Sequence, residues 1–261
     1  MKFFLSNIFF LLMYVFYSVS GQGKAVSTSK EGETCSFLDG VFVSVMRRIF
    51  SQGFHKQLLS EVEVMLTTTL LPDKCQLLVE ETMPRGAYVD PDEMRDLRFK
   101  TGLRSYIPAK VDVEKPEFES EAFRVFIFRT LKVRENLRVT SIQLPVHIRY
   151  HKPDTPDHHS THPMATAKIP NPRLLLACPQ EDILTNCTSR KVTAFCDETG
   201  TAKCEWVNLP YKINVASVEV SVPVGNMDHT SLVVGVTTLV TCGATIYLII
   251  TMFRQVKQKT E

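Results

Sequence analysis

Alternating hydrophobic and polar positions recur along the middle of the chain and predict a body built mainly of β-strands. A strand sends successive side chains to opposite faces, so a period of two indicates a sheet rather than a helix. The stretches that show this period are residues 40–50, 54–66, 75–80, 122–133, 138–150, 173–178 and 211–222. The first two are expected to join at Gly53.

A few residues interrupt this pattern and predict other structure. Asp90 followed by Pro91 predicts a short helix that extends through Leu97, because aspartate caps a helix and proline suits its first turn. Pro145 has no N–H group for a strand ladder, so it predicts an edge or a bulge within its strand. Residues 151–163 are polar and rich in proline, which predicts a loop.

The predicted fold class is an all-β body, an antiparallel sandwich rather than a parallel sheet. Strands dominate, and the connections between them are long and irregular. Apolar side chains occur on both faces of residues 122–133, which indicates that both faces are partly covered. A body of about two hundred residues suits one domain, with two small packed domains as the alternative.

Apolar segments at the two ends of the chain predict its topology. Residues 1–21 have one lysine, an apolar run and small closing residues, which is typical of a removed signal peptide; an uncleaved anchor is the alternative. Residues 230–253 carry no charge and are long enough to cross a bilayer. Basic residues predominate in residues 254–261, which predicts a cytoplasmic tail. We therefore expect a single-pass type I protein with residues 22–229 as a lumenal or extracellular β-rich domain.

Six of the seven cysteines lie in this domain, an even number in an oxidising compartment. The six are candidates for disulfide bonds: Cys35, Cys75, Cys178, Cys187, Cys196 and Cys204. Cys35 and Cys75 are one conceivable separate pair, although six cysteines allow fifteen pairings and the sequence does not choose among them. A zinc site in the cluster 178–204 is the competing hypothesis, weakened by the absence of a C-x-x-C pair.

Sequence patterns typical of enzymes are missing. The chain has no G-x-S-x-G, no phosphate-binding glycine loop and no H-E-x-x-H. His158, His159 and His162 form an H-H-x-x-H group, but flanking prolines favour a solvated loop over a metal site. Neighbouring acids such as Glu80 and Glu81 have the spacing of ordinary surface acids. We therefore expect no catalytic residue, cofactor or metal, and the balance of 30 basic and 28 acidic residues argues against nucleic acid as a partner.

Three further features concern processing and membrane contacts. Asn186 begins the glycosylation sequon Asn-Cys-Thr. Lys257 and Lys259 have the spacing of a K-x-K-x-x retrieval signal, with enforcement of topology as the alternative role. The apolar segment 230–253 contains several small or weakly polar residues, which favours a membrane partner over a plain anchor.

Several short strings in this chain look like one protein family. The strings are Gly53-Phe54-His55-Lys56 with Leu58-Leu59, Pro84-Arg85-Gly86-Ala87-Tyr88-Val89-Asp90-Pro91, Leu144-Pro145-Val146-His147-Ile148-Arg149-Tyr150-His151-Lys152-Pro153, Asn171-Pro172-Arg173-Leu174-Leu175, Cys204-Glu205-Trp206, Val222-Pro223-Val224-Gly225 and His229-Thr230-Ser231-Leu232. In this order they resemble PIG-X, the accessory subunit of glycosylphosphatidylinositol (GPI) mannosyltransferase I, from about residue 40 to the apolar segment.

The resemblance implies a non-catalytic protein of the endoplasmic reticulum membrane. It would bind and stabilise PIG-M, the multispanning catalytic subunit that transfers the first mannose from dolichol-phosphate mannose to the GPI precursor. No catalytic residue carries over, since catalysis lies in the partner. Candidate partner contacts within the strings are Phe54, His55, Tyr88, His147 and Tyr150, with a role in folding as the alternative. Topology and β pattern alone also fit a cell-surface recognition or adhesion protein.

Overall fold

The computed structural model describes residues 35, 38, 40–50, 53–66, 75–134, 137–155, 162–178 and 187–260. The predicted signal peptide, the sequon at Asn186 and two members of the H-H-x-x-H group, His158 and His159, lie outside the described residues. The remaining member, His162, lies in a bend and is exposed.

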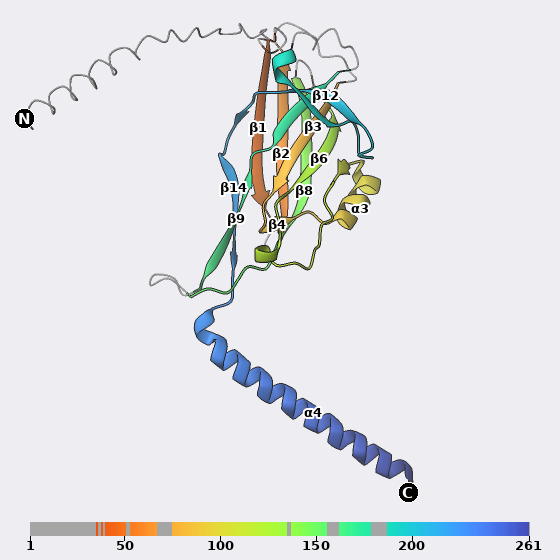
Figure 1. The fold of residues 1–261 in the computed structure, drawn as a ribbon, viewed down its shortest axis with the longest axis vertical. Helices are drawn as coiled ribbons and strands as arrows, with labels where there is room; N and C mark the ends of the chain where they lie inside the picture. Colours follow the sequence, from red (N-terminus) through yellow and green to blue (C-terminus); the bar gives the residue numbers. More distant parts are fainter. Residues whose placement is uncertain are drawn as a thin grey trace, which may run out of the picture. The chain divides into compact units, whose positions relative to one another are not determined.

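Two β-sheets and a two-stranded ribbon form the body (Figure 1). The first sheet has the order β13 (Lys212–Ile213), β1 (Val41–Phe50), β2 (His55–Leu66), β8 (Leu137–Ile148) and β4 (Ala87–Tyr88), with β7 (Lys132–Arg134) also paired to β8. The second has the order β11 (Lys191–Phe195), β12 (Lys203–Asn208), β10 (Arg173–Ala177), β3 (Gln76–Met83), β6 (Phe123–Thr130) and β5 (Arg104–Tyr106). The ribbon pairs β9 (Met164–Pro170) with β14 (Ser217–Pro223).

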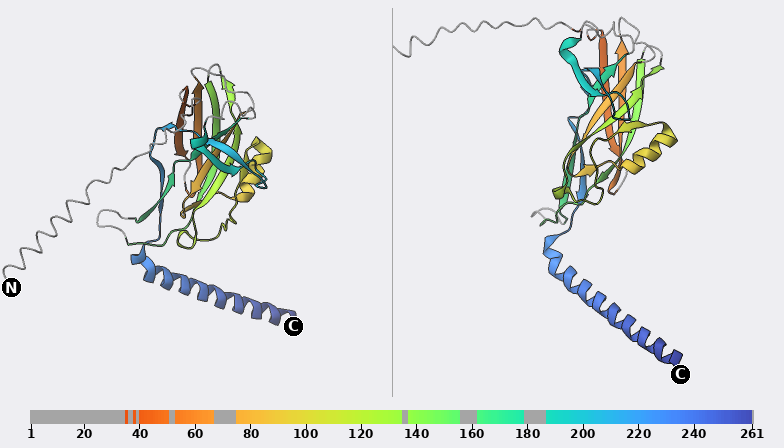
Figure 2. Two further views of the ribbon diagram at one scale, coloured as in Figure 1. Left: turned by 45° about the horizontal axis from the view of Figure 1, so that its top comes forward. Right: turned by 45° about the vertical axis from the view of Figure 1, so that its right-hand side comes forward.

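The main core lies between the sheets and the ribbon, where alternate side chains of each strand meet. Leu58 and Val62 from β2, Leu77 from β3 and Val220 from β14 belong to one cluster of buried residues. Each large apolar side chain buried in this way contributes roughly 1.5–3 kcal/mol to folding. The two layers can be followed in Figure 2, and they confirm the predicted all-β sandwich.

A second, smaller core covers the other face of the second sheet. Phe126 and Phe128 of β6 pack there with Trp206 of β12 and with Phe195 of β11, and the Phe126–Phe195 ring centroids lie 5.0 Å apart. The prediction that residues 122–133 are covered on both faces is therefore confirmed for β6.

Within the described part of the chain, strand pairings are antiparallel except for two contacts, the short β1–β13 pair and an isolated bridge between Asp154 and Asn226. Pro145 is an edge residue rather than a bulge. The register between β8 and β2 is unbroken, while β7 and β4 pair with the other side of β8 only at its two ends. The missing N–H of Pro145 therefore breaks no pairing with β2.

Two α-helices occur among the described residues. The first, α3 (Pro91–Thr101), begins as predicted, because the Asp90 side chain accepts a hydrogen bond of 2.8 Å from the Asp92 N–H. It runs beyond the predicted end at Leu97 and stops at Gly102, which has a φ of 71°. The same described residues also contain three short 3₁₀ turns: η1 (Glu117–Glu119), η3 (Thr188–Arg190) and η4 (Met227–His229).

The C-terminal helix, α4 (Thr230–Thr260), follows β14 and η4. Within it and η4, Met227–Gln255 forms a stretch long and apolar enough to cross a membrane, and its side chains are not buried against the body. This stretch contains the predicted span 230–253. The side chains of the retrieval candidates, Lys257 and Lys259, lie outside the description.

All six cysteines predicted to form disulfides are paired. The bonds are Cys35–Cys187, Cys75–Cys178 and Cys196–Cys204, so the conceivable pairing of Cys35 with Cys75 is wrong. Cys35 instead bonds to Cys187, which immediately precedes η3. Cys75 immediately precedes β3, and it bonds to Cys178, which follows the neighbouring strand β10.

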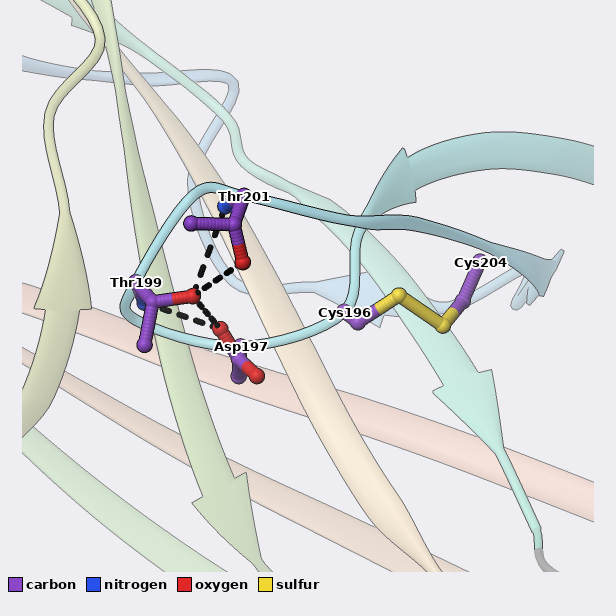
Figure 3. Close-up of a disulfide and its surroundings, with 5 residues drawn as sticks. All are labelled: Cys196, Asp197, Thr199, Thr201 and Cys204. Atoms are coloured by element: carbon purple, nitrogen blue, oxygen red, sulfur yellow. Dashed lines mark hydrogen bonds between the residues drawn. A yellow bond between two sulfur atoms is a disulfide. The ribbon is translucent and has the colours of Figure 1, made fainter.

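The Cys196–Cys204 bond closes the hairpin between β11 and β12, which the sequence pattern did not predict. Figure 3 shows its turn, in which one Asp197 oxygen accepts hydrogen bonds from the N–H and the hydroxyl of Thr199, at 2.9 and 2.6 Å. The turn docks on the rest of the body through Glu198, which forms ion pairs with Arg98 and Arg104.

Candidate functional site

Three aromatic rings stack at one end of the first sheet, where β2 begins and β8 ends. His147 lies opposite His55 on one neighbouring strand and Tyr88 on the other. The His55 and His147 rings stack 4.5 Å apart and 10° from parallel, and the Tyr88 and His147 ring centroids lie 5.0 Å apart. Cross-strand neighbours on one face meet in this way, so His147 is held between the other two rings.

Glu93, from the first turn of α3, reaches both histidines. One carboxylate oxygen lies 2.9 Å from His147 Nε2, and the other lies 3.5 Å from His55 Nε2. The cap at Asp90 fixes where α3 begins and so places Glu93 over the stacked rings. The His55 ring also lies within 3.3 Å of the Gln57 side-chain nitrogen.

Arg149 completes the group through its contact with Tyr88. Its guanidinium lies 4.6 Å from the centre of the Tyr88 ring and donates hydrogen bonds of 2.7 Å to the carbonyls of Asp112 and Lys115. Burial lowers the pKa of Arg149 and raises the pKa of Tyr88, while their mutual attraction opposes both shifts. We call His55, Tyr88, Glu93, His147 and Arg149 the histidine–tyrosine cluster.

An aromatic pair borders this cluster. The Phe54 and Tyr150 rings lie 5.4 Å apart, and the Ile148 N–H donates to the Phe54 carbonyl at 2.8 Å, which fixes the backbone between them. Tyr150 is 75% exposed, so most of its ring is accessible from outside the body. We call Phe54 and Tyr150 the aromatic pair.

Hydrogen bonds connect this region to the root of α4. The Asp154 N–H donates to the Gly225 carbonyl at 2.9 Å, and the Met227 N–H donates to the Asp154 carbonyl at 3.0 Å. The segment that follows β8 is thus bonded to the residues that precede α4. The histidine–tyrosine cluster therefore lies at the end of the body from which the apolar helix continues.

A buried ion pair supports the body behind this surface. Arg47 of β1 donates to Glu81 of β3 at 2.8 Å across the main core, and both side chains are at most 2% exposed. Burial raises the pKa of Glu81 to about 7, although Arg47 acts in the opposite direction. On the other face of β3, Glu80 is buried between Arg124 and Arg173. The prediction that Glu80 and Glu81 are surface acids is therefore wrong.

Two asparagines tie the ion pair to neighbouring segments. Asn214 acts as a substitute strand partner, accepting from the Arg47 N–H at 2.9 Å and donating to the Arg47 carbonyl at 3.2 Å. Asn171 donates to the carbonyls of Val215 and Ala216 at 3.1 and 2.8 Å. The Arg47 guanidinium also donates to the Pro170 carbonyl at 2.7 Å. The Asn171-Pro172-Arg173 string thus has a structural role.

The five candidate contacts from the sequence, Phe54, His55, Tyr88, His147 and Tyr150, lie together in the cluster and the aromatic pair. Sequence reasoning missed Glu93, Arg149, Arg47 and Glu81. Arg149 lies within one of the quoted strings, so that string was its signal. No sequence signal pointed to Glu93, because its role depends on where α3 packs. The cluster offers stacking faces, hydrogen-bonding groups and metal-ligand atoms.

Comparison with known proteins identifies the family to which this sequence is similar. A sequence model of the PIG-X / PBN1 family matches residues 51–253. A human protein named "GPI alpha-1,4-mannosyltransferase I, stabilizing subunit" is 32% identical over 216 residues, which cover 81% of this chain and 80% of that protein. Proteins with the same name from Rattus norvegicus and Mus musculus are 31% and 30% identical and cover 84% and 80% of this chain, and 86% and 81% of their own lengths.

The fold defines a disulfide-bonded β-sandwich protein with one C-terminal helix capable of crossing a membrane. The chain belongs to the PIG-X / PBN1 family. Its named relatives are accessory subunits of a mannosyltransferase rather than the catalytic subunit.

Proposed function

We propose that this chain is the non-catalytic stabilising subunit of GPI mannosyltransferase I. In this role it keeps the multispanning catalytic subunit PIG-M assembled and so supports transfer of the first mannose from dolichol-phosphate mannose to the GPI precursor. The observation that carries the proposal is that three relatives, each at least 30% identical over at least 80% of this chain, bear the stabilizing-subunit name.

The proposed location is the endoplasmic reticulum membrane, with the body in the lumen. Three disulfides suit an oxidising compartment, and the basic residues after the span suit a cytoplasmic tail. The predicted signal peptide agrees with this orientation. Lys257 and Lys259 would then serve retrieval from later compartments.

The proposed contact surface on the body is the outer face of the first sheet. The histidine–tyrosine cluster lies at one end of this face, and the aromatic pair, whose Phe54 packs against the main core, adjoins that end. Apolar side chains that are 44–51% exposed continue the face along β1 and β2: Phe42, Met46, Phe50 and Met65. Aromatic and methionine side chains are enriched in protein interfaces, and a lumenal segment of the catalytic subunit is the occupant that we propose.

The helix α4 supplies the proposed contact within the membrane. Its small and weakly polar residues include Gly235 and Gly243, where an added side-chain carbon would meet no neighbouring atom of this chain. The hydroxyls of Thr241 and Thr245 donate to carbonyls of the preceding turn, at 2.9 and 2.8 Å, so they are already satisfied within the helix. A helix with small residues and satisfied hydroxyls allows close approach of a partner helix.

Stabilisation then follows from mass action. A partner that binds the folded catalytic subunit, and not its unfolded form, lowers the population exposed to degradation. The test is the amount and lifetime of the catalytic subunit in cells lacking this chain, with and without its restoration. Depletion that restoration reverses is the expected result. An unchanged lifetime, or arrival of this chain at the plasma membrane with a complex sugar at Asn186, would favour a surface recognition role instead.

A further inference from the structure

Two histidines and one glutamate, drawn from three separate elements, bring their ligand atoms together on the outer face of the first sheet. His55 lies on β2, Glu93 on α3 and His147 on β8. One nitrogen from each histidine and one oxygen from Glu93 lie within 4.8 Å of one another. We propose that these three side chains bind one divalent transition-metal ion, with zinc as the ion that this ligand set suits best.

The chemical types of the three side chains are the first support for a metal site. Two neutral imidazoles and one carboxylate form a known zinc ligand set, and three protein ligands leave a position for water or for a group from outside. The three side chains are partly exposed, so an ion can reach them: His55 by 50%, Glu93 by 30% and His147 by 25%. Arg149, which lies over the Tyr88 ring, is engaged by two main-chain carbonyls.

The geometry needs one small change to close around an ion. Zinc bonds of about 2.0–2.2 Å place tetrahedral ligand atoms about 3.3–3.5 Å apart. One Glu93 oxygen lies 2.9 Å from His147 Nε2 and the other lies 3.5 Å from His55 Nε2, while one atom from each of the three residues lies within 4.8 Å of the others. Nearly parallel rings cannot both direct a nitrogen at one ion, so His55 must turn out of its stack and leave its contact with Gln57. Its half-exposed side chain has room for this rotation.

Such an ion would join β2, α3 and β8 at the end of the body next to the root of α4. The proposal is independent of the proposed partner, since it concerns only this chain and the metal. It also explains why the sequence predicted no metal site: the three ligands come from distant segments, and none forms a spacing motif with another.

The test is zinc binding by the purified full-length chain in detergent, carrying no histidine tag and first freed of metal with a chelator. Zinc affinity is measured by competition with a chromophoric chelator, and cobalt serves as a second probe through its visible absorption. We expect one site, weakened at least about tenfold in His55→Asn, Glu93→Gln and His147→Asn. His229→Asn, which alters an exposed histidine outside the cluster, is the matched control and should bind as the unchanged chain does.

His55→Asn keeps the test decisive, because its half-exposed side chain makes the substitution compatible with folding. Equal affinity in the unchanged chain and all variants, or no zinc binding, would overturn the proposal. A loss confined to Glu93→Gln would overturn it as well, since the histidines would then not be ligands.

Discussion

Arg47 and Glu81 face each other across the main core, with guanidinium and carboxylate 2.8 Å apart and no more than 2% of either side chain exposed. This pair joins β1 of the first sheet to β3 of the second. Breaking a buried pair by removing one partner is far more costly than breaking a surface pair, because the remaining charge stays in a dry environment.

We expect Arg47→Met to lower the free energy of unfolding by about 3–5 kcal/mol above pH 7, where Glu81 would be left buried and uncompensated. Denaturant unfolding followed by the fluorescence of Trp206, the single and buried tryptophan, measures this effect. Lys168→Met is the control, since it breaks an exposed pair with Glu219 and should cost less than about 1 kcal/mol. Similar losses in both variants would contradict the assigned role of the buried pair.

The pH dependence of stability should also report on Glu81. Its pKa of about 7 in the folded chain is above the usual 4.5, so the folded state holds this proton more tightly than the unfolded state. The resulting stability is complete below pH 4.5 and is lost as the pH rises through 7, by an amount on the order of 3 kcal/mol. Unfolding of the unchanged chain and of Glu81→Gln across this range should show the decline only when Glu81 is present. Parallel pH profiles would refute the shift.

Two disulfides should differ in their contributions. Cys75–Cys178 spans 103 residues and Cys196–Cys204 spans 8. Loop-closure entropy assigns about 4.7 kcal/mol to the longer loop and about 2.5 kcal/mol to the shorter one. The double variants Cys75→Ala with Cys178→Ala and Cys196→Ala with Cys204→Ala, compared by thermal unfolding, should rank in this order. The reverse order would show that local packing outweighs chain entropy.

Two glycines with the same backbone conformation allow a steric comparison. Gly53 and Gly200 have φ values of 72° and 66°, but an added side-chain carbon at Gly53 meets nothing within 4 Å, whereas at Gly200 it would overlap the Tyr106 ring. We expect Gly53→Ala to cost about 1–2 kcal/mol through its backbone alone. Gly200→Ala should cost about 1–3 kcal/mol more by displacing the β11–β12 hairpin. Calorimetry of both variants measures the difference, and equal costs would mean that Tyr106 moves aside freely.

The proposed contact surface can be tested at Tyr150. Tyr150→Ser should reduce recovery of the catalytic subunit with this chain and leave its unfolding midpoint nearly unchanged, because the side chain is 75% exposed. Phe99→Ser removes another exposed aromatic side chain, on α3, and should have no effect on recovery. Co-purification from membranes measures both variants. Equal recovery of the partner with Tyr150→Ser and with the unchanged chain would remove Tyr150 from the interface.

Sequence reasoning succeeded where strands are long and alternate regularly, as in β1 and β2. It missed β11 and β12, whose short strands depend on a disulfide and on Trp206 and Phe195 in the smaller core. It also treated Glu80 and Glu81 as exposed, because their arginine partners come from three other strands. The five candidate contacts were identified from short sequence strings. That they lie together could not be predicted, because it depends on the pairing of β8 with β2 and β4.

The ribbon of β9 and β14 also determines how the body would bear mechanical load. The strand β14 continues through η4 into α4, and it pairs with β9 over seven successive residues, from Ser217 opposite Pro170 to Pro223 opposite Met164. A pull on Pro223 along the strand would be resisted from the opposite end of the ribbon, where β9 leads into β10. The pairs would then be sheared together rather than unzipped one at a time, so tension applied through α4 would reach the core as a shared force.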